Sequence, residues 1–166
     1  MARQLWLLRH AEAEPHGSRA DSERRLTARG EAQARVAGLA LARLDVAFES
    51  VLFSPKVRAR QTAVLAAEAW SSEERECLTE HPPLAGDFAA SGAREALHAV
   101  SPDGRLLLVG HEPDLSRLLY ELTGARADFK KGGVAAVRLE RASGELIALL
   151  RPRDLALIAG VPAGGQ

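Results

Sequence analysis

Short apolar runs alternate along this chain with longer segments in which apolar residues recur at helical spacing. The short runs predict strands buried on both faces, over Leu5–Leu8, Val51–Phe53 and Leu106–Val109. The longer segments predict helices that follow these strands, over about 27–44, 55–70 and 113–122. Two further strands, over 134–139 and 146–150, predict a hairpin across Ala142–Gly144. Strands that alternate with helices are typical of an α/β domain with a mainly parallel sheet.

The predicted helix ends rest on capping residues. Thr27 suits the N-cap of the first helix. Ser54 suits the N-cap of the second, with Pro55 at its first position, so strand should pass directly into helix there. Gly124 is the expected stop of the third. These signals predict the same order of strand, turn and helix three times over.

The rest of the chain is less informative. Ser71–Arg105 shows one short helical pattern, over about Ala93–Val100. No internal repeat or linker is evident, so we expect a single domain over residues 1–160 and a flexible tail over 161–166.

Composition excludes several classes of protein. Lys+Arg and Asp+Glu both number 22, and this formal neutrality argues against a nucleic-acid binder. Cys77 is the sole cysteine, so neither an intramolecular disulfide nor a thiolate metal cluster is possible. No apolar run approaches the ~18–20 residues of a membrane span, and the first is too short for a signal peptide. We therefore expect a cytoplasmic monomer without a membrane partner.

Polar residues follow each of the three buried strands. They are Arg9-His10, Ser54-Pro55 with Arg58 beyond, and Gly110-His111. In open α/β sheets, ligands bind beyond the carboxyl ends of the strands, so these residues should converge if the strands are parallel neighbours. Arg58 falls in the first turn of a helix, where free N–H groups favour an anion.

Helix phase distinguishes Arg58 from Arg60. The two lie about 200° apart around the helix, so one of them can face the site, and Thr62 shares the face of Arg58. We assign Arg58 to the site. His16, His81 and His98 lack converging partners and are expected at the surface.

Two histidines and two arginines around one point indicate a phosphoryl group. Arginine offers a planar fork of donors that matches phosphate oxygens, and imidazole is often neutral at pH 7 and able to attack phosphorus. We expect His10 to be the nucleophile. No carboxylate pair or cysteine cluster accompanies these residues, so neither a metal nor another cofactor is expected.

Four ordered motifs resemble the histidine phosphatase superfamily, also called phosphoglycerate-mutase-like. They are Leu8-Arg9-His10-Ala11, Leu26-Thr27-x-x-Gly30, Ser54-Pro55-x-x-Arg58-Ala59-x-Gln61-Thr62-Ala63 and Val109-Gly110-His111-Glu112-Pro113. The compact length, the residues after His111 and Lys130-Lys131-Gly132-Gly133 are similar to the SixA-type phosphohistidine phosphatases. The resemblance implies a three-layer α/β/α sandwich with a mainly parallel central sheet.

The resemblance also implies residue roles. His10 matches the nucleophile that becomes transiently phosphorylated, and Arg9, Arg58 and His111 match the rest of the phosphate pocket. Arg24 lies where SixA-like members often have an arginine and is a further candidate for substrate binding. Ala11 departs from the glycine of many members, although alanine is familiar in the SixA-like branch.

The general acid of the wider superfamily has no clear match here. Glu80, His81 and Asp87 are the candidates in the short segment before Arg105. Phosphohistidine needs less acid catalysis than a phosphate ester, because its leaving imidazole is far less basic than an alkoxide. The expected substrate is therefore phosphohistidine on a protein, with Lys130 and Lys131 as candidate rim charges.

Two alternatives stay open. A small-molecule phosphomonoesterase on the same pocket would need Glu80 or Asp87 in contact with the site. A non-catalytic phosphate-binding module would keep the pocket without turnover.

Overall fold

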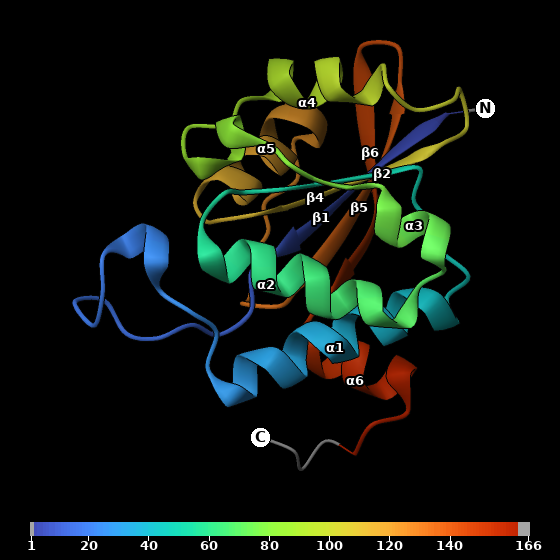
Figure 1. Ribbon diagram of the computed structural model, residues 1–166. Helices are drawn as coiled ribbons and strands as arrows, with labels where there is room; N and C mark the ends of the chain where they lie inside the picture. The colour runs from blue at the N-terminus through green and yellow to red at the C-terminus, as the bar shows by residue number, and fades with distance from the viewer. Residues whose placement is uncertain (1, 163–166) are drawn as a thin grey trace.

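The apolar runs of the sequence form the centre of a mixed β-sheet (Figure 1). The computed structural model describes residues 2–162. Within that range the strands are β1 (Arg3–Arg9), β2 (Ser50–Phe53), β3 (Leu78–Glu80), β4 (Arg105–Gly110), β5 (Val134–Glu140) and β6 (Ser143–Leu150). Their order across the sheet is β3-β2-β4-β1-β5-β6. The pairs within β3-β2-β4-β1 are parallel and those within β1-β5-β6 are antiparallel, which confirms the mainly parallel sheet.

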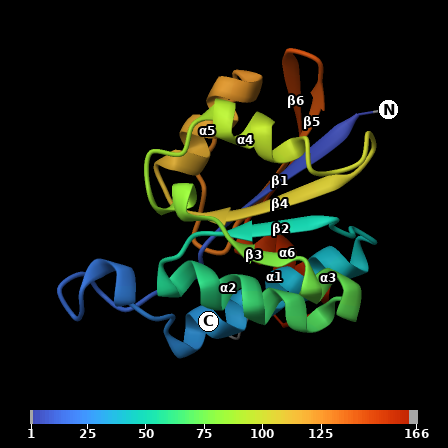
Figure 2. The ribbon, with the colours of Figure 1, turned by 45° about the horizontal axis from the view of Figure 1, so that its top comes forward.

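Helices cover both faces of the sheet and complete three layers. The helices among the described residues are α1 (Ala28–Arg43), α2 (Val57–Ala66), α3 (Ser72–Glu76), α4 (Ala90–Leu97), α5 (Asp114–Thr123) and α6 (Pro152–Ala159). Short 3-10 turns occur at η1 (Asp21–Glu23), η2 (Ala67–Ala69) and η3 (Pro82–Ala85). Helices α1, α2 and α6 pack on one face, and α4 and α5 on the other (Figure 2). The predicted α/β/α sandwich is therefore confirmed.

Strand β1 shows why its apolar run is unbroken. Trp6 and Leu8 enter the core under α1, α2 and α6, whereas Leu5 and Leu7 enter the core under α4 and α5. Because successive side chains of a strand point to opposite faces, a strand covered on both sides has no position for a polar residue. The polar residues of β1 therefore lie at its two ends, on either side of the apolar run.

The prediction that Ser54 caps α2 is wrong. The helix begins at Val57, and Lys56 holds the N-cap position in an extended conformation without a side-chain cap. Three residues, Ser54, Pro55 and Lys56, thus separate β2 from α2. The Ser54 hydroxyl lies against His111 instead. A capping residue is favoured locally, but here a contact between distant segments determines where the side chain lies.

The other helix ends follow the predicted signals. Thr27 Oγ1 accepts a hydrogen bond from Gly30 N at 3.1 Å and caps α1. Gly124 ends α5 in the left-handed region, with φ 76°. The β5–β6 turn falls at Arg141-Ala142, earlier than predicted, because Ser143 and Gly144 already pair with β5. Of the predicted tail 161–166, residues 163–166 lie outside the described part of the chain.

Three elements have no counterpart in the sequence-based prediction: α3, β3 and α6. Strand β3 forms the sheet edge next to β2, and α6 packs beside α1. No helix within residues 2–162 is long and apolar enough to cross a membrane.

Candidate active site

The carboxyl ends of β1, β2 and β4 meet at one edge of the sheet. Leu8 and Phe53 both pair with Val109, and Arg9 pairs with Gly110. Two backbone hydrogen bonds continue this alignment past the strands, from His10 N to Gly110 O and from Ser54 N to Val109 O, both 3.0 Å. The polar residues that follow the three strands are therefore brought together, as the parallel arrangement predicts.

His10 is buried and has one unprotonated ring nitrogen. Its Nδ1 lies 2.8 Å from Ala11 O, to which it donates, so Nε2 carries the lone pair. Burial, reinforced by the positive charges of Arg58 and Arg9, lowers the pKa of His10 to about 3. The imidazole is therefore neutral at pH 7 and can act as a nucleophile through Nε2.

Arg58 donates a hydrogen bond to that nitrogen. Its Nε is 3.4 Å from His10 Nε2, and the Arg58 side chain is 5% exposed. Arg60 points away and pairs with Glu80 at 2.8 Å, with both side chains about half exposed. Thr62 shares the face of Arg58: its hydroxyl donates to Arg58 O at 2.7 Å and accepts from Ala11 N at 3.1 Å. The helix phase inferred from the sequence is correct.

Arg9 lies at the end of β1. Its Nη1 donates to Phe129 O at 2.6 Å, which fixes the guanidinium against the segment before β5. Its Nε is buried without a hydrogen-bond partner among the described residues. A buried cationic donor without a partner is costly in a folded protein, and a bound anion would satisfy it.

His111 completes the group. Its ring centroid lies 5.2 Å from that of His10. Its Nε2 is 2.7 Å from Ser54 Oγ, while its buried Nδ1 has no partner in the described part of the chain. Burial, followed by the charges of its neighbours, lowers the pKa of His111 to about 3, so this ring too is neutral at pH 7.

A carboxylate that sequence reasoning missed ties the cations of the site together. Asp21 lies in η1, on the loop that projects beside the start of α2 (Figures 1 and 2). Its side chain contacts Arg24 Nη2 at 2.9 Å, Lys56 Nζ at 3.0 Å and Arg58 Nη2 at 3.3 Å. These partners, Lys56 foremost, hold the pKa of the Asp21 carboxyl well below its usual range. No sequence signal marks it, because an aspartate in a polar loop is ordinary.

Arg24 is buried, but its donors serve the protein. Its Nε and Nη2 bond Asp21 Oδ1, and its Nη1 donates to Glu14 O at 2.7 Å. Arg24 therefore orients Asp21, which in turn contacts Arg58. Its role in binding a substrate stays a prediction.

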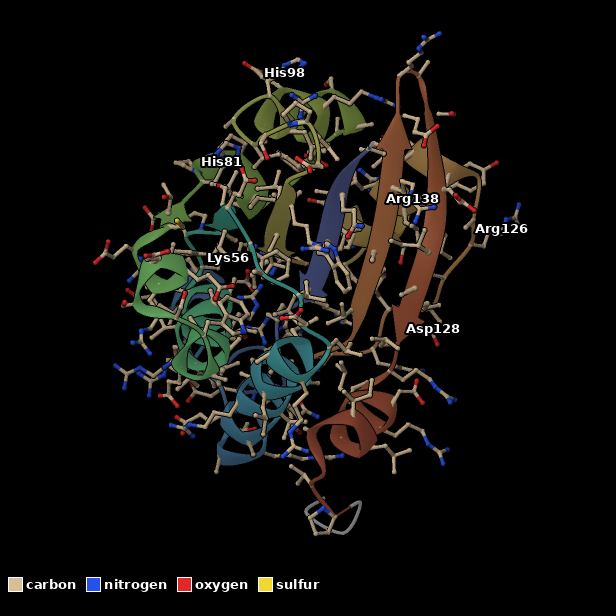
Figure 3. The ribbon with its side chains drawn as sticks, turned by 90° about the vertical axis from the view of Figure 1, so that its right-hand side faces the viewer. Lys56, His81, His98, Arg126, Asp128 and Arg138 are labelled. Atoms are coloured by element: carbon tan, nitrogen blue, oxygen red, sulfur yellow. The ribbon has the colours of Figure 1, made fainter. Side chains whose placement is uncertain are left out.

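The remaining candidates lie at or beyond the rim. Lys131 is close enough for its charge to lower the pKa of His10, whereas Lys130 pairs with Asp128 at 2.7 Å. Asp87 is almost fully exposed, and its nearest cation is Arg117 at 3.9 Å. Figure 3 shows His98 beside α4, at the end of the molecule opposite to the carboxyl end of β1.

His81 is half-buried, contrary to its expected place at the surface, and its ring packs edge-on against Phe88.

The site can bind a tetrahedral anion. Two fixed guanidinium groups and two neutral imidazoles surround one point, with Lys56 nearby. Within residues 2–162, no group of three or more His, Cys, Asp or Glu side chains is arranged to hold a metal ion. Charge neutralisation at this site is therefore available from the arginines.

Comparisons with known proteins identify the family of the chain. Residues 5–82 match the profile of the histidine phosphatase superfamily (branch 1). An uncharacterized protein of Picosynechococcus sp. is 34% identical over 146 residues, which are 81% of this chain and 84% of that protein. The chain belongs to the histidine phosphatase superfamily and is a phosphatase of that class.

Solved structures narrow the class. The protein histidine phosphatase SixA, complexed with tungstate, superposes with a TM-score of 0.79 at 26% identity, covering 92% of this chain and 99% of SixA. A SixA-like protein of Nakamurella multipartitia gives a TM-score of 0.75 at 24% identity, with 92% and 97% covered. Within the superfamily, the chain has the fold and extent of the SixA-type branch. An α-ribazole-5′-P phosphatase structure from Escherichia coli shares the fold, with a TM-score of 0.72 at 22% identity over 91% of this chain and 98% of that one.

Proposed function

We propose that this phosphatase removes the phosphoryl group from phosphohistidine on proteins, without a metal, through a phosphohistidine intermediate on His10. The similarity to SixA, a protein histidine phosphatase, supports this substrate class. The observation that supports the proposal is that the candidate carboxylates Asp21, Glu80 and Asp87 are ion-paired or extend into solvent, so that none is placed as a proton donor.

The first step is an in-line transfer. His10 Nε2 attacks phosphorus, the P–N bond to the substrate imidazole breaks, and the electron pair of that bond stays on the substrate nitrogen. The substrate ring carries a proton on its other nitrogen, so it leaves as neutral imidazole. Arg9, Arg58 and His111 hold the three equatorial oxygens of the phosphoryl group. They stabilise the charge that develops there, which is the largest contribution to such transfers.

The second step is hydrolysis of the phosphoenzyme. A water oxygen attacks phosphorus, the bond to His10 Nε2 breaks, and inorganic phosphate is released with His10 regenerated. The contact from His10 Nδ1 to Ala11 O keeps the ring in one orientation through both steps.

The candidate carboxylates Asp21, Glu80 and Asp87 are poor proton donors. Asp21 contacts three cations, and its pKa is held well below its usual range, so it is ionised at any working pH. Glu80 is paired with Arg60, and Asp87 extends into solvent. Without a protonated acid, expulsion of an alkoxide is slow, whereas imidazole leaves with little help. This favours a P–N substrate over an alkyl phosphate.

The charge of Lys131 also suits a substrate carried on a protein. Lys131 is exposed, and its charge reaches His10. A cationic rim of this kind would attract an acidic protein surface around the phosphohistidine.

A substrate panel tests the proposal. We expect kcat/KM to fall in the order phosphohistidine peptide, aryl phosphate, alkyl phosphate, and activity to persist after exhaustive treatment with EDTA. Sugar or glycerol phosphates turned over as fast as the peptide would indicate a hidden acid and a small-molecule phosphomonoesterase. Loss on chelation with recovery on adding a divalent cation would overturn the metal-independent mechanism. A binding module without turnover would show no acid-labile, alkali-stable ³²P label on His10.

A further inference from the structure

Ser54 is a fully buried hydroxyl at the centre of the site, and the mechanism above gives it no task. It is 0% exposed, and its backbone N–H is fixed to Val109 O at the end of β4. The sequence suggests that its side chain caps α2, but in the structure it does not. A buried hydroxyl needs partners, and those of Ser54 determine how a neighbouring ring carries its proton.

The hydrogen bonds of Ser54 can be counted completely. Lys56 N–H donates to Ser54 Oγ at 3.3 Å, and this uses the hydroxyl as an acceptor. The other contact of the hydroxyl within residues 2–162 is His111 Nε2, at 2.7 Å. The hydroxyl proton is therefore satisfied when it is donated to His111 Nε2, which must then be unprotonated.

The opposite tautomer of His111 leaves the hydroxyl of Ser54 unsatisfied. With a proton on Nε2, that hydroxyl would have no acceptor for its own proton among residues 2–162. The buried Nδ1 of His111 has no partner in either tautomer, so it does not decide between them in the free protein. A buried hydroxyl proton without an acceptor is costly, and this cost favours a proton on Nδ1.

We propose that Ser54 is a positioning residue that holds His111 in its Nδ1–H tautomer, so that His111 donates a hydrogen bond to a phosphoryl oxygen as a neutral ring. Its relevance to turnover rests on the proposed function, whereas the tautomer itself does not. Free imidazole side chains favour the Nε2–H form, so a fixed Nδ1–H form is a property imposed by the protein.

The two histidines then share a tautomer but present opposite ends. His10 donates from Nδ1 to Ala11 O and turns its bare Nε2 to the pocket. His111 accepts at Nε2 from Ser54 and keeps an Nδ1–H without a partner among residues 2–162, which is then the donor available to a phosphoryl oxygen. One ring offers a lone pair to phosphorus, and the other donates a hydrogen bond to a phosphoryl oxygen. The two ring planes lie 53° apart. The lowered pKa of both rings keeps them neutral, which is the state in which a tautomer is defined.

The direct test is ¹⁵N NMR of the full chain labelled at histidine, at neutral pH and without substrate. We expect His111 to show a protonated Nδ1 and an unprotonated Nε2. In Ser54→Ala we expect the Nε2–H form to become populated and kcat to fall about 10- to 100-fold. A loss of this size follows when a histidine that binds a metal loses the hydrogen-bond partner that orients it. Ser54→Thr, which keeps a hydroxyl, should restore the wild-type signals and most of the rate.

A matched control separates this role from stability. Ser71→Ala removes a serine hydroxyl that caps α3, far from His111. It should lower the melting temperature while leaving both the His111 signals and kcat unchanged. If Ser54→Ala does not fold, the wild-type spectrum and Ser54→Thr still decide the tautomer.

The outcomes separate the tautomer from the proposed function. An Nε2–H ring in wild type, or unchanged signals and rate in a folded Ser54→Ala, overturns the proposal. If the wild type shows the Nδ1–H form but hydrolyses no phosphohistidine peptide, the substrate assignment fails alone. In that case weaker binding of tungstate to Ser54→Ala than to Ser71→Ala still supports the positioning role, and equal binding overturns it.

Discussion

Replacing Arg58 by lysine should damage catalysis far more than replacing Arg60. Lysine keeps the charge but loses the planar fork, and with it the simultaneous contacts of Arg58 to His10 Nε2, Asp21 O and Asp21 Oδ2. Loss of one preorganised donor to developing charge typically lowers kcat by about 10²–10³, or roughly 2.7–4 kcal/mol of transition-state stabilisation. We expect Arg58→Lys to fall in that range.

Arg60→Lys is the matched control on the same helix. Arg60 and Glu80 are about half exposed, and an exposed ion pair contributes only about 0.2–1 kcal/mol to stability. Its substitution should leave kcat/KM nearly unchanged. The assay is steady-state hydrolysis of a phosphohistidine peptide, with melting temperatures to establish that both variants fold. For Arg58→Lys the fall in kcat should exceed the rise in KM, because the donors are aimed at charge that develops in the transition state. Equal damage from the two substitutions, or near-normal turnover by folded Arg58→Lys, would refute the reasoning.

Three further perturbations test other parts of the site. His10→Ala should abolish turnover and the ³²P label in a folded protein, and activity above about a tenth of wild type would remove His10 from its role. Because His10 and His111 have folded pKa values near 3 against an ordinary 6.5, the unfolded state binds more protons between these values. The free energy of unfolding should therefore fall as pH drops from 6.5 toward 3, and less steeply in His111→Asn; equal slopes in denaturant titrations would contradict this. Lys131→Gln should slow hydrolysis of an acidic phosphohistidine peptide more than Lys130→Gln, since Asp128 already neutralises Lys130. That difference should shrink between about 0.01 and 0.15 M salt, and a salt-independent difference would argue against rim attraction.

The parts of the site that sequence could predict are those attached to the central strands. An apolar run that ends at Arg9-His10 fixes both the strand and the place where polar chemistry begins. The same holds for β4 and His111. Helix phase then separates Arg58 from Arg60 without any knowledge of packing. Each inference depends on backbone periodicity, which the sequence carries directly.

The parts it could not predict depend on contacts between distant segments. Ser54 has an ideal local capping sequence, yet its hydroxyl bonds a ring 57 positions away. Asp21 contributes to the site because it pairs with Lys56 and Arg58, and the sequence of its own loop does not predict these contacts. Strand β3 has one apolar residue in three and lies at the sheet edge, so no hydrophobic period marks it. Gly38 weakens a helix by propensity, but a Cβ there would lie 1.9 Å from Ala66 O, so close packing of α1 on α2 requires it.

The sheet order also constrains when the site can form during folding. Strand β1 comes first in the chain, but its two neighbours are β4 and β5, so Leu8 pairs with Val109 on one side and Val134 on the other. Such pairings close very long loops, and their entropy must be overcome before the contacts form. His10 precedes His111 in the chain, and the two meet only after the residues between them exist. We therefore expect anion binding at this site to require closure of the central sheet, so that the recovery of anion binding during refolding would measure that late event.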